Sequence, residues 1–141
     1  MSGIYNYTIV KELNLIIMVL QNELSIDRLK VMREDIANDK DFNPDCKLLI
    51  DVRLAKLNIG TNDLRLFAKW YRGVSKMNPS NKKVFLTSNP DQVMKSFIFT
   101  AISYLSSFKV FSTRRACLDS LKIDISNTKL VKDEIKKMKG K

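Results

Sequence analysis

Apolar residues alternate with polar ones, or run together, in two short stretches at the start of the chain. Ile4–Val10 and Leu13–Leu20 are rich in β-branched and aromatic residues, and only Lys11 and Glu12 separate them. Such stretches predict strands, and so short a connection predicts a tight hairpin. We therefore expect these two strands to be antiparallel neighbours in a sheet.

The spacing then becomes helical, and strand and helix patterns alternate along the chain. Ser25 is a residue type that caps helices, and the segment after it, to about Asn38, carries Leu29, Met32 and Ile36 on one face. Leu48–Val52 predicts the next strand. A second helix is expected from about Asn62 to Met77, with a buried side formed by Leu64, Phe67, Ala68, Tyr71 and Val74.

The same alternation continues in the second half. Val84–Thr87 predicts a short strand, and Asn89 followed by Pro90 is a typical helix start. This third helix is expected to reach about Ser107 and to bury Met94, Phe97, Ile98, Ile102 and Leu105, with Phe99 outside the buried arc. Lys109–Phe111 predicts the last strand, and Thr113 begins a short helix that carries Leu118 and Leu121.

Strands that alternate with helices of this length predict βαβ crossovers. We expect an α/β fold of order ββαβαβαβα, with a mixed, mostly parallel sheet of four or five strands. Because the strands Leu48–Val52 and Val84–Thr87 are only partly apolar, one sheet face is expected to be less thoroughly covered. Residues 1–123 would form the single domain. Residues 124–141 would be a basic extension, at most a short helix aligning Val131, Ile135 and Met138, and frayed and solvated.

Composition adds a strong positive charge. The net charge is +10 over 141 residues, which favours phosphates, anionic membrane surfaces or acidic proteins as partners, although the charge can also serve solubility alone. The two cysteines make no disulfide framework, so a reducing cytoplasm is the expected setting. The longest apolar run, Leu13–Leu20, is too short for a transmembrane segment, and no secretory signal is visible.

The chain contains no histidine and only four glycines. The missing histidine excludes the usual Ser-His-Asp and Cys-His nucleophiles and most zinc sites. The scarcity of glycine argues against a phosphate-cradling loop. We therefore expect a protein that is not an enzyme, with no catalytic residues, no cofactor and no metal.

The second helix carries cations on one side. Its basic stripe consists of Arg65, Lys69, Arg72 and Lys76, with Trp70 and Leu66 beside it. Like charges four residues apart destabilise a helix, so the stripe is either a plain solvated face or a contact for an acidic partner or anionic headgroups, with Trp70 as anchor. Nucleic acid is disfavoured because aromatic residues do not interleave with the basic ones. In the third helix, Phe99 is a candidate dimer or lipid face; the alternative is that it belongs to the core.

Polar residues also follow each predicted strand, and they would meet at one edge of a parallel sheet. They are Glu23, Ser25, Asp51, Arg53, Ser88, Asn89, Ser112 and Thr113. This edge could face an anion through the helix N-termini. The alternative is a set of ordinary helix caps, with Asp51 tied to nearby N–H groups.

The opening ELNLIIMVLQNELS and the strand LLIDVR followed by a helix start, in this order of elements, resemble the STAS domain of bacterial anti-sigma-factor antagonists. The resemblance runs from Ile4 to Ile123 and is closest to the stand-alone STAS-like group related to lipid-binding CRAL-TRIO domains. In the antagonists, an Asp-Ser-Ser-Gly elbow carries a serine that a kinase phosphorylates. The corresponding stretch here is Asn58–Asp63, in which Thr61 is the only hydroxyl. Thr61 is therefore the candidate switch position, and a plain helix N-cap is the alternative.

From the residues and this resemblance together, we expect a non-enzymatic STAS-like binding or regulatory module in the cytoplasm. It would act through a protein partner or through a second copy of itself. The alternative is binding of a lipid or small apolar ligand at a membrane surface, with anionic lipid as a partner. A phosphorylation-switched anti-sigma-factor antagonist is the third reading.

Overall fold

The predicted hairpin opens the fold in the computed structural model, which describes the backbone of residues 4–78, 80–103 and 108–139 and the side chains of 6–78, 80–100 and 108–139. β1 (Ile4–Val10) pairs antiparallel with β2 (Leu15–Glu23). Their connection is a 3-10 turn, η1 (Lys11–Leu13), followed by Asn14 in a left-handed conformation with φ 51°. The hairpin is confirmed, with a longer turn than expected.

Three further strands extend the sheet in chain order, β1-β2-β3-β4-β5, and all run parallel to β2. They are β3 (Lys47–Lys56), β4 (Lys83–Leu86) and β5 (Phe108–Phe111). The connecting helices are α1 (Ile26–Ala37), α2 (Thr61–Val74) and α3 (Pro90–Ser103), and α4 (Arg114–Ser120), η2 (Ile125–Asn127) and α5 (Thr128–Met138) follow β5. The predicted mixed, mostly parallel α/β fold is confirmed.

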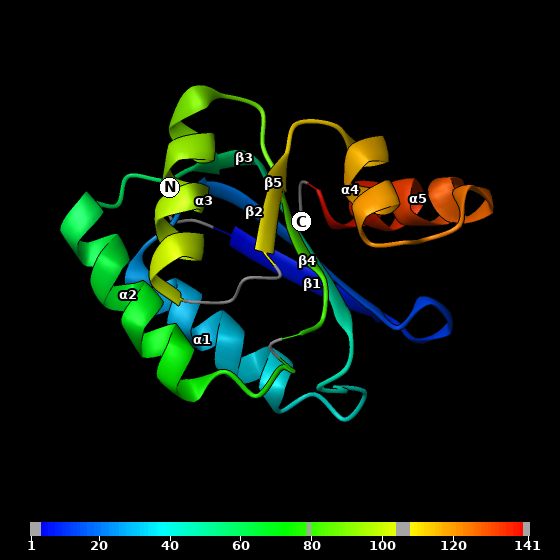
Figure 1. Cartoon of the computed structure of the whole chain (residues 1–141), viewed down its shortest axis with the longest axis horizontal. Helices are drawn as coiled ribbons and strands as arrows, with labels where there is room; N and C mark the ends of the chain where they lie inside the picture. The colour runs from blue at the N-terminus through cyan, green and yellow to red at the C-terminus, as the bar shows by residue number, and fades with distance from the viewer. Residues whose placement is uncertain (1–3, 79, 104–107, 140–141) are drawn as a thin grey trace.

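The helices form two layers around the sheet. α1, α2 and α3 cover one face, and α4 and α5 cover the other (Figure 1). In β2, Ile16, Met18 and Leu20 point to the first layer, and the residues between them point to the second. Because the described residues of β3 and β4 are also buried on both faces, apart from the N- and C-terminal ends of β3, the prediction of a poorly covered face is wrong.

The covering of the second face comes from a segment that was expected to be solvated. Val131, Ile135 and Met138 of α5 are 0%, 2% and 5% exposed. The carbonyl of Met138 also accepts hydrogen bonds from the side chains of Asn6 and Gln21. The description of this tail as frayed is therefore wrong, because its aligned apolar residues pack on the sheet. The division of the chain at residue 123 stays a prediction.

α3 buries a different side from the one that the sequence predicts. Phe99 is only 7% exposed, whereas Met94 and Phe97 are 50% and 58% exposed. The ring of Phe99 packs among those of Phe67, Phe85 and Phe108, with centroids 5.5–5.9 Å apart, and this aromatic cluster fixes the helix rotation. The side chain of Ile102 and all of Leu105 lie outside the described residues, as does the expected helix end near Ser107.

Within the described part of the chain, no helix combines the length and the apolar character needed to cross a membrane.

Candidate functional site

Three of the polar residues that follow the strands act as helix caps. The hydroxyl of Ser25 accepts from the N–H of Arg28 at 3.2 Å, and the side chain of Asn89 accepts from Gln92 at 2.9 Å. Thr113 caps α4 in the same way through Ala116 at 3.1 Å. The capping alternative is confirmed for these three positions.

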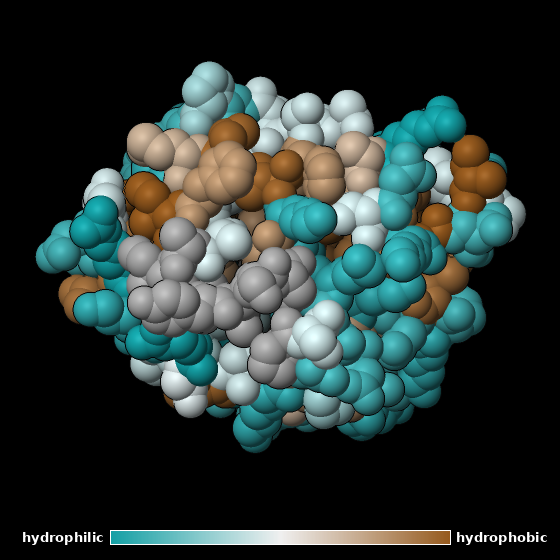
Figure 2. Space-filling view, in the orientation of Figure 1, coloured by the Kyte–Doolittle hydropathy of each residue, from teal (hydrophilic) through white to brown (hydrophobic). Residues whose placement is uncertain are grey.

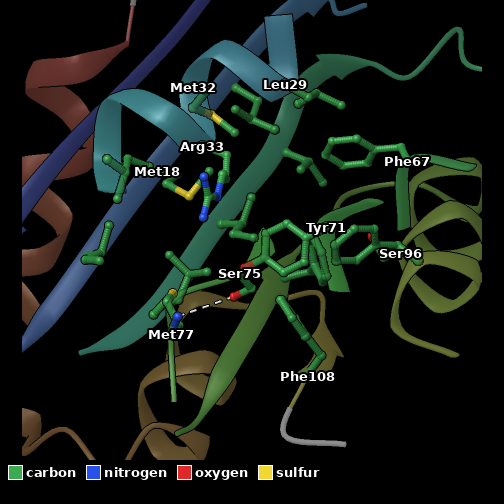
Figure 3. Close-up of a pocket in the computed structure, with 18 of the residues that line it drawn as sticks. Met18, Leu29, Met32, Arg33, Phe67, Tyr71, Ser75, Met77, Ser96 and Phe108 are labelled. Carbon is green, nitrogen blue, oxygen red and sulfur yellow. Dashed lines mark hydrogen bonds between the residues drawn. The ribbon is translucent and has the colours of Figure 1, made fainter. Parts of the chain in front are cut away.

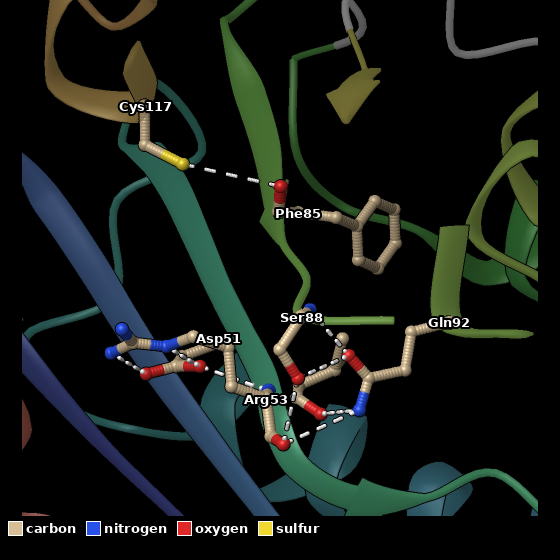
Figure 4. A network of polar contacts seen from close by, with 7 residues as sticks. Asp51, Arg53, Phe85, Ser88, Gln92 and Cys117 are labelled. Carbon is tan, nitrogen blue, oxygen red and sulfur yellow. Dashed lines mark hydrogen bonds and ion pairs between the residues drawn. The ribbon is translucent and has the colours of Figure 1, made fainter. Parts of the chain in front are cut away.

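Asp51 lies on the face covered by α4 and α5 and is 1% exposed. Its carboxylate accepts from the Arg53 backbone N–H at 3.0 Å and pairs with the Arg53 guanidinium at 2.9–3.0 Å (Figure 4). Beside this pair, burial raises the pKa of the Cys117 thiol to about 12. Asp51 and Arg53 satisfy each other and the thiol donates to the carbonyl of Phe85 at 3.9 Å, so we assign these groups a structural role.

Gln92, at the start of α3, joins α3 to the end of β3. Its amide donates to the carbonyls of Val52 at 2.7 Å and Ala55 at 3.1 Å, and its oxygen accepts from the Ser88 N–H at 2.7 Å (Figure 4). Sequence reasoning missed this residue because a lone glutamine carries no periodic signal.

A cavity of about 120 Å³ lies between the sheet and the α1–α3 layer. Its walls are mainly apolar, and three methionines contribute to them: Met18 of β2, Met32 of α1 and Met77 of the loop after α2 (Figure 3). Aromatic rings line it as well, namely Phe42, Phe67, Tyr71, Phe85, Phe99 and Phe108. The sequence placed Met32, Phe67 and Tyr71 on buried helix faces but gave no sign that the walls leave a space.

Few polar groups reach this cavity. Among the described lining residues the charged ones are Arg33, Lys76 and Lys95. The side chains of Arg33 and Lys95 are 12% and 15% exposed. Arg33 comes from α1 and points inward among the labelled lining residues (Figure 3). The cavity therefore joins an apolar interior to basic groups.

The basic stripe on α2 is only partly as predicted. Arg65, Lys69 and Arg72 are exposed on the helix, but α2 ends at Val74, so Lys76 lies beyond it. Trp70, the expected anchor beside the stripe, is half-buried. Its ring stacks on Phe67 with centroids 5.7 Å apart, and the ammonium of Lys30 lies 5.1 Å from its centroid.

Thr61 does not cap α2. It is the first helical residue, Gly60 holds the cap position, and α2 has no side-chain cap hydrogen bond. The capping role predicted for Thr61 is therefore wrong, because the helix begins one residue earlier than expected. Its side chain is exposed at the helix N-terminus.

The prediction of a dimer or lipid face at Phe99 is wrong, because this residue is buried in the core. The apolar surface of α3 is instead formed by Met94 and Phe97. Half-buried Ile98, next to Phe97 on α3, and Val110, on the terminal strand β5, pack against the core on the same sheet face. Apolar side chains gather over α3 and β5 on the face shown in Figure 2. We call Met94, Phe97, Ile98 and Val110 the α3–β5 patch.

Comparison with known proteins agrees with the architecture. No protein-family model matches the chain, and no curated protein sequence matches it. Among solved structures, the crystal structure of an anti-sigma factor antagonist from Mycobacterium paratuberculosis is similar, with a TM-score of 0.55 over 84% of this chain and 95% of that one. The two sequences are 15% identical, so the likeness establishes the STAS-like fold alone. It gives no support to the CRAL-TRIO relation.

Proposed function

We propose that this protein is a non-enzymatic regulatory binding module and that a protein partner docks on its α3–β5 patch. The observation that carries the proposal is the exposure of two large apolar side chains, Met94 and Phe97, on one helix. Scattered single apolar residues are normal on a surface, but neighbouring ones beside further apolar groups are typical of contact sites.

The fold adds to this proposal. The similar crystal structure is of an anti-sigma factor antagonist, and we extend a regulatory role of that kind to this chain. β5 ends the sheet that the described residues form, so a partner placed on the patch would also reach the outer edge of this strand. An aromatic anchor such as Phe97 beside a strand edge would supply both binding energy and orientation. The cytoplasm remains the expected location.

The experiment is capture of partners from a lysate of the cells in which the chain is native. The bait is compared with two variants, Phe97→Glu and Ile125→Glu. Ile125 is 69% exposed and lies on η2, so it serves as the matched control for an apolar-to-acidic change. We expect one protein to bind the unchanged chain and the Ile125 variant and to be lost with the Phe97 variant. The same proteins bound by all three baits would contradict the proposal.

A phosphorylation switch at Thr61 is a second candidate function. The exposed hydroxyl at the start of α2, free of a capping hydrogen bond, favours it. A phosphate there would interact favourably with the helix dipole. Stoichiometric phosphate on Thr61 in protein from native cells would support the switch, and its absence under every growth condition tested would rule it out.

Binding of a small apolar molecule is the third candidate, and the cavity favours it. The lipid-binding relation implied by the sequence resemblance would place such a ligand at a membrane surface. Native mass spectrometry of freshly purified protein tests this role, because a bound ligand adds its own mass to the folded chain. A spectrum with the chain mass alone would count against a tightly held apolar ligand.

A further inference from the structure

We propose that the cavity between the sheet and the α1–α3 layer binds a small anionic amphiphile, a carboxylate with about six carbons in its chain or ring, whose head group sits at Arg33. The proposal rests on the candidate function of apolar ligand binding and gives that ligand a charge, a size and an orientation. It is independent of partner docking on the α3–β5 patch, because none of the four patch residues lines the cavity.

The size follows from the cavity volume. A dry cavity of about 150 Å³ lined by apolar side chains holds one benzene molecule. The volume here, about 120 Å³, is of that order, so a short alkyl chain or one ring fits and a long acyl chain does not. Met18, Met32 and Met77 line the space, and their unbranched side chains can adjust to the shape of a ligand.

The charge follows from the lining residues. All three charged residues among those described, Arg33, Lys76 and Lys95, are cationic. Glu34 pairs with Arg33 at 2.7 Å, but this carboxylate is 54% exposed and does not line the cavity. A largely buried guanidinium beside an apolar space favours an anion over a neutral or cationic ligand of the same shape.

The orientation follows from what surrounds each cation, and Lys76 is the exposed one of the three. Lys95 already donates to the carbonyl of Leu57 and pairs with Asp91 at 3.2 Å. Arg33 bonds Glu34 and the carbonyl of Val74, yet a guanidinium has five N–H donors, so it can also hold a ligand carboxylate.

Neutral hydroxyl groups accompany Arg33. Ser75 also lines the cavity and forms a hydrogen bond with Tyr71, and burial raises the pKa of the Tyr71 phenol. Tyr71 therefore stays uncharged and does not oppose an anion at this end. The end of the cavity near Arg33 and Ser75 is thus the place for the carboxylate, with the chain extending towards the aromatic rings.

The test uses three probes that share one alkyl chain and differ in charge: hexanoate, 1-hexanol and hexylammonium. The protein carries methyl-labelled methionine, so that the binding of each probe is followed through individual methyl signals in NMR titrations. We expect hexanoate to shift Met18, Met32 and Met77. Met94, on the surface, and Met138, in the core on the other sheet face, serve as internal controls and should not shift. We expect affinity to fall from hexanoate to hexanol to hexylammonium.

Two variants locate the head group. Arg33→Gln should weaken hexanoate binding by about tenfold or more and leave hexanol binding nearly unchanged, because it removes a charge-assisted hydrogen bond. Arg65→Gln removes an exposed cation of α2 that does not line the cavity and should change neither. An unchanged Met138 signal shows that each variant is folded.

The outcomes separate the preference for an anionic ligand from apolar ligand binding in general. Equal binding of hexanoate and hexanol at the three cavity methionines would overturn the anionic ligand and leave apolar ligand binding intact. Absence of shifts at these methionines with every probe, or shifts confined to Met94 and Met138, would overturn both.

Discussion

Lys83 is fully buried at the start of β4, and its ammonium donates to the backbone carbonyls of Asn78 at 3.0 Å and Asn81 at 2.8 Å. These bonds tie the loop before β4 to the strand. Burial lowers the pKa of this lysine from 10.5 to about 8. A single residue therefore makes the stability of the whole chain depend on pH.

The sign of that dependence follows from proton binding. Between pH 8 and pH 10.5 the unfolded chain holds the Lys83 proton and the folded chain releases it, so the free energy of unfolding contributed by this group rises with pH. Below that window the cost of burying the charge is fully present. We expect the difference in unfolding free energy between the unchanged chain and Lys83→Met to rise by about 1–3 kcal/mol between about pH 7 and about pH 10. Urea unfolding measures it, and a difference independent of pH would contradict this account of Lys83.

Thr61 and Asn89 offer a second test at the scale of one residue. Both stand at helix starts, but Asn89 accepts the N–H of Gln92 and Thr61 accepts no capping bond. Asn89→Ala should therefore cost about 1 kcal/mol of stability. Thr61→Ala should stay within about 0.5 kcal/mol. A loss at Thr61 equal to that at Asn89, measured by thermal or urea unfolding, would restore the capping role.

At the scale of elements, α5 and α2 use the same amphipathic pattern for different purposes. α5 buries Val131, Ile135 and Met138 against the sheet and leaves its lysines in solvent. α2 buries Leu64, Phe67 and Ala68 and presents Arg65, Lys69 and Arg72 outward. α5 therefore matters for stability, while the outer side of α2 can contact a partner.

Ile135→Ala should destabilise the fold by about 2–5 kcal/mol, because the side chain is 2% exposed and its loss leaves a cavity under α5. The exposed neighbour Lys136→Ala is the matched control and should stay within about 0.5 kcal/mol. Urea unfolding of the two variants decides the role of the C-terminal segment. Equal stabilities would mean that the segment is a dispensable tail after all.

The basic stripe on α2 is tested by charge reversal. Arg65→Glu with Lys69→Glu should leave the fold intact and weaken binding to anionic vesicles, more strongly at low salt. Lys132→Glu with Lys136→Glu makes the same change in net charge at the same spacing on α5, and both residues are exposed. Cosedimentation with vesicles compares the two pairs. Equal weakening by both pairs would assign the effect to net charge rather than to the stripe.

At the scale of the whole molecule, local patterns predict the order of elements and tertiary packing decides which faces are used. The hairpin and the strand–helix alternation can be predicted because each depends on a few neighbouring residues, such as Ser25 with Leu29. The rotation of α3 cannot, because apolar residues cover about half of the helix and the buried half is selected by tertiary packing on rings such as those of Phe67, Tyr71 and Phe85.

The same contrast between local patterns and tertiary packing applies to the candidate sites. The exposed cations Arg65, Lys69 and Arg72 could be identified from spacing alone. The cavity could not, because its walls come from both the sheet and three helices and its volume depends on how they pack. Phe99 shows the consequence: as a core residue it is no longer a suitable position for testing self-association, and Phe97 takes its place.

The most direct test of partner docking on the α3–β5 patch is photo-crosslinking in native cells. A photoreactive phenylalanine analogue is placed at Phe97, which is 58% exposed, and, as a control, at Ile125, which is 69% exposed. The account predicts one crosslinked product from position 97 and none from position 125, and the mass of the product distinguishes a second copy of this chain from a different protein. No product at position 97, or the same product from both positions, would contradict docking on this patch.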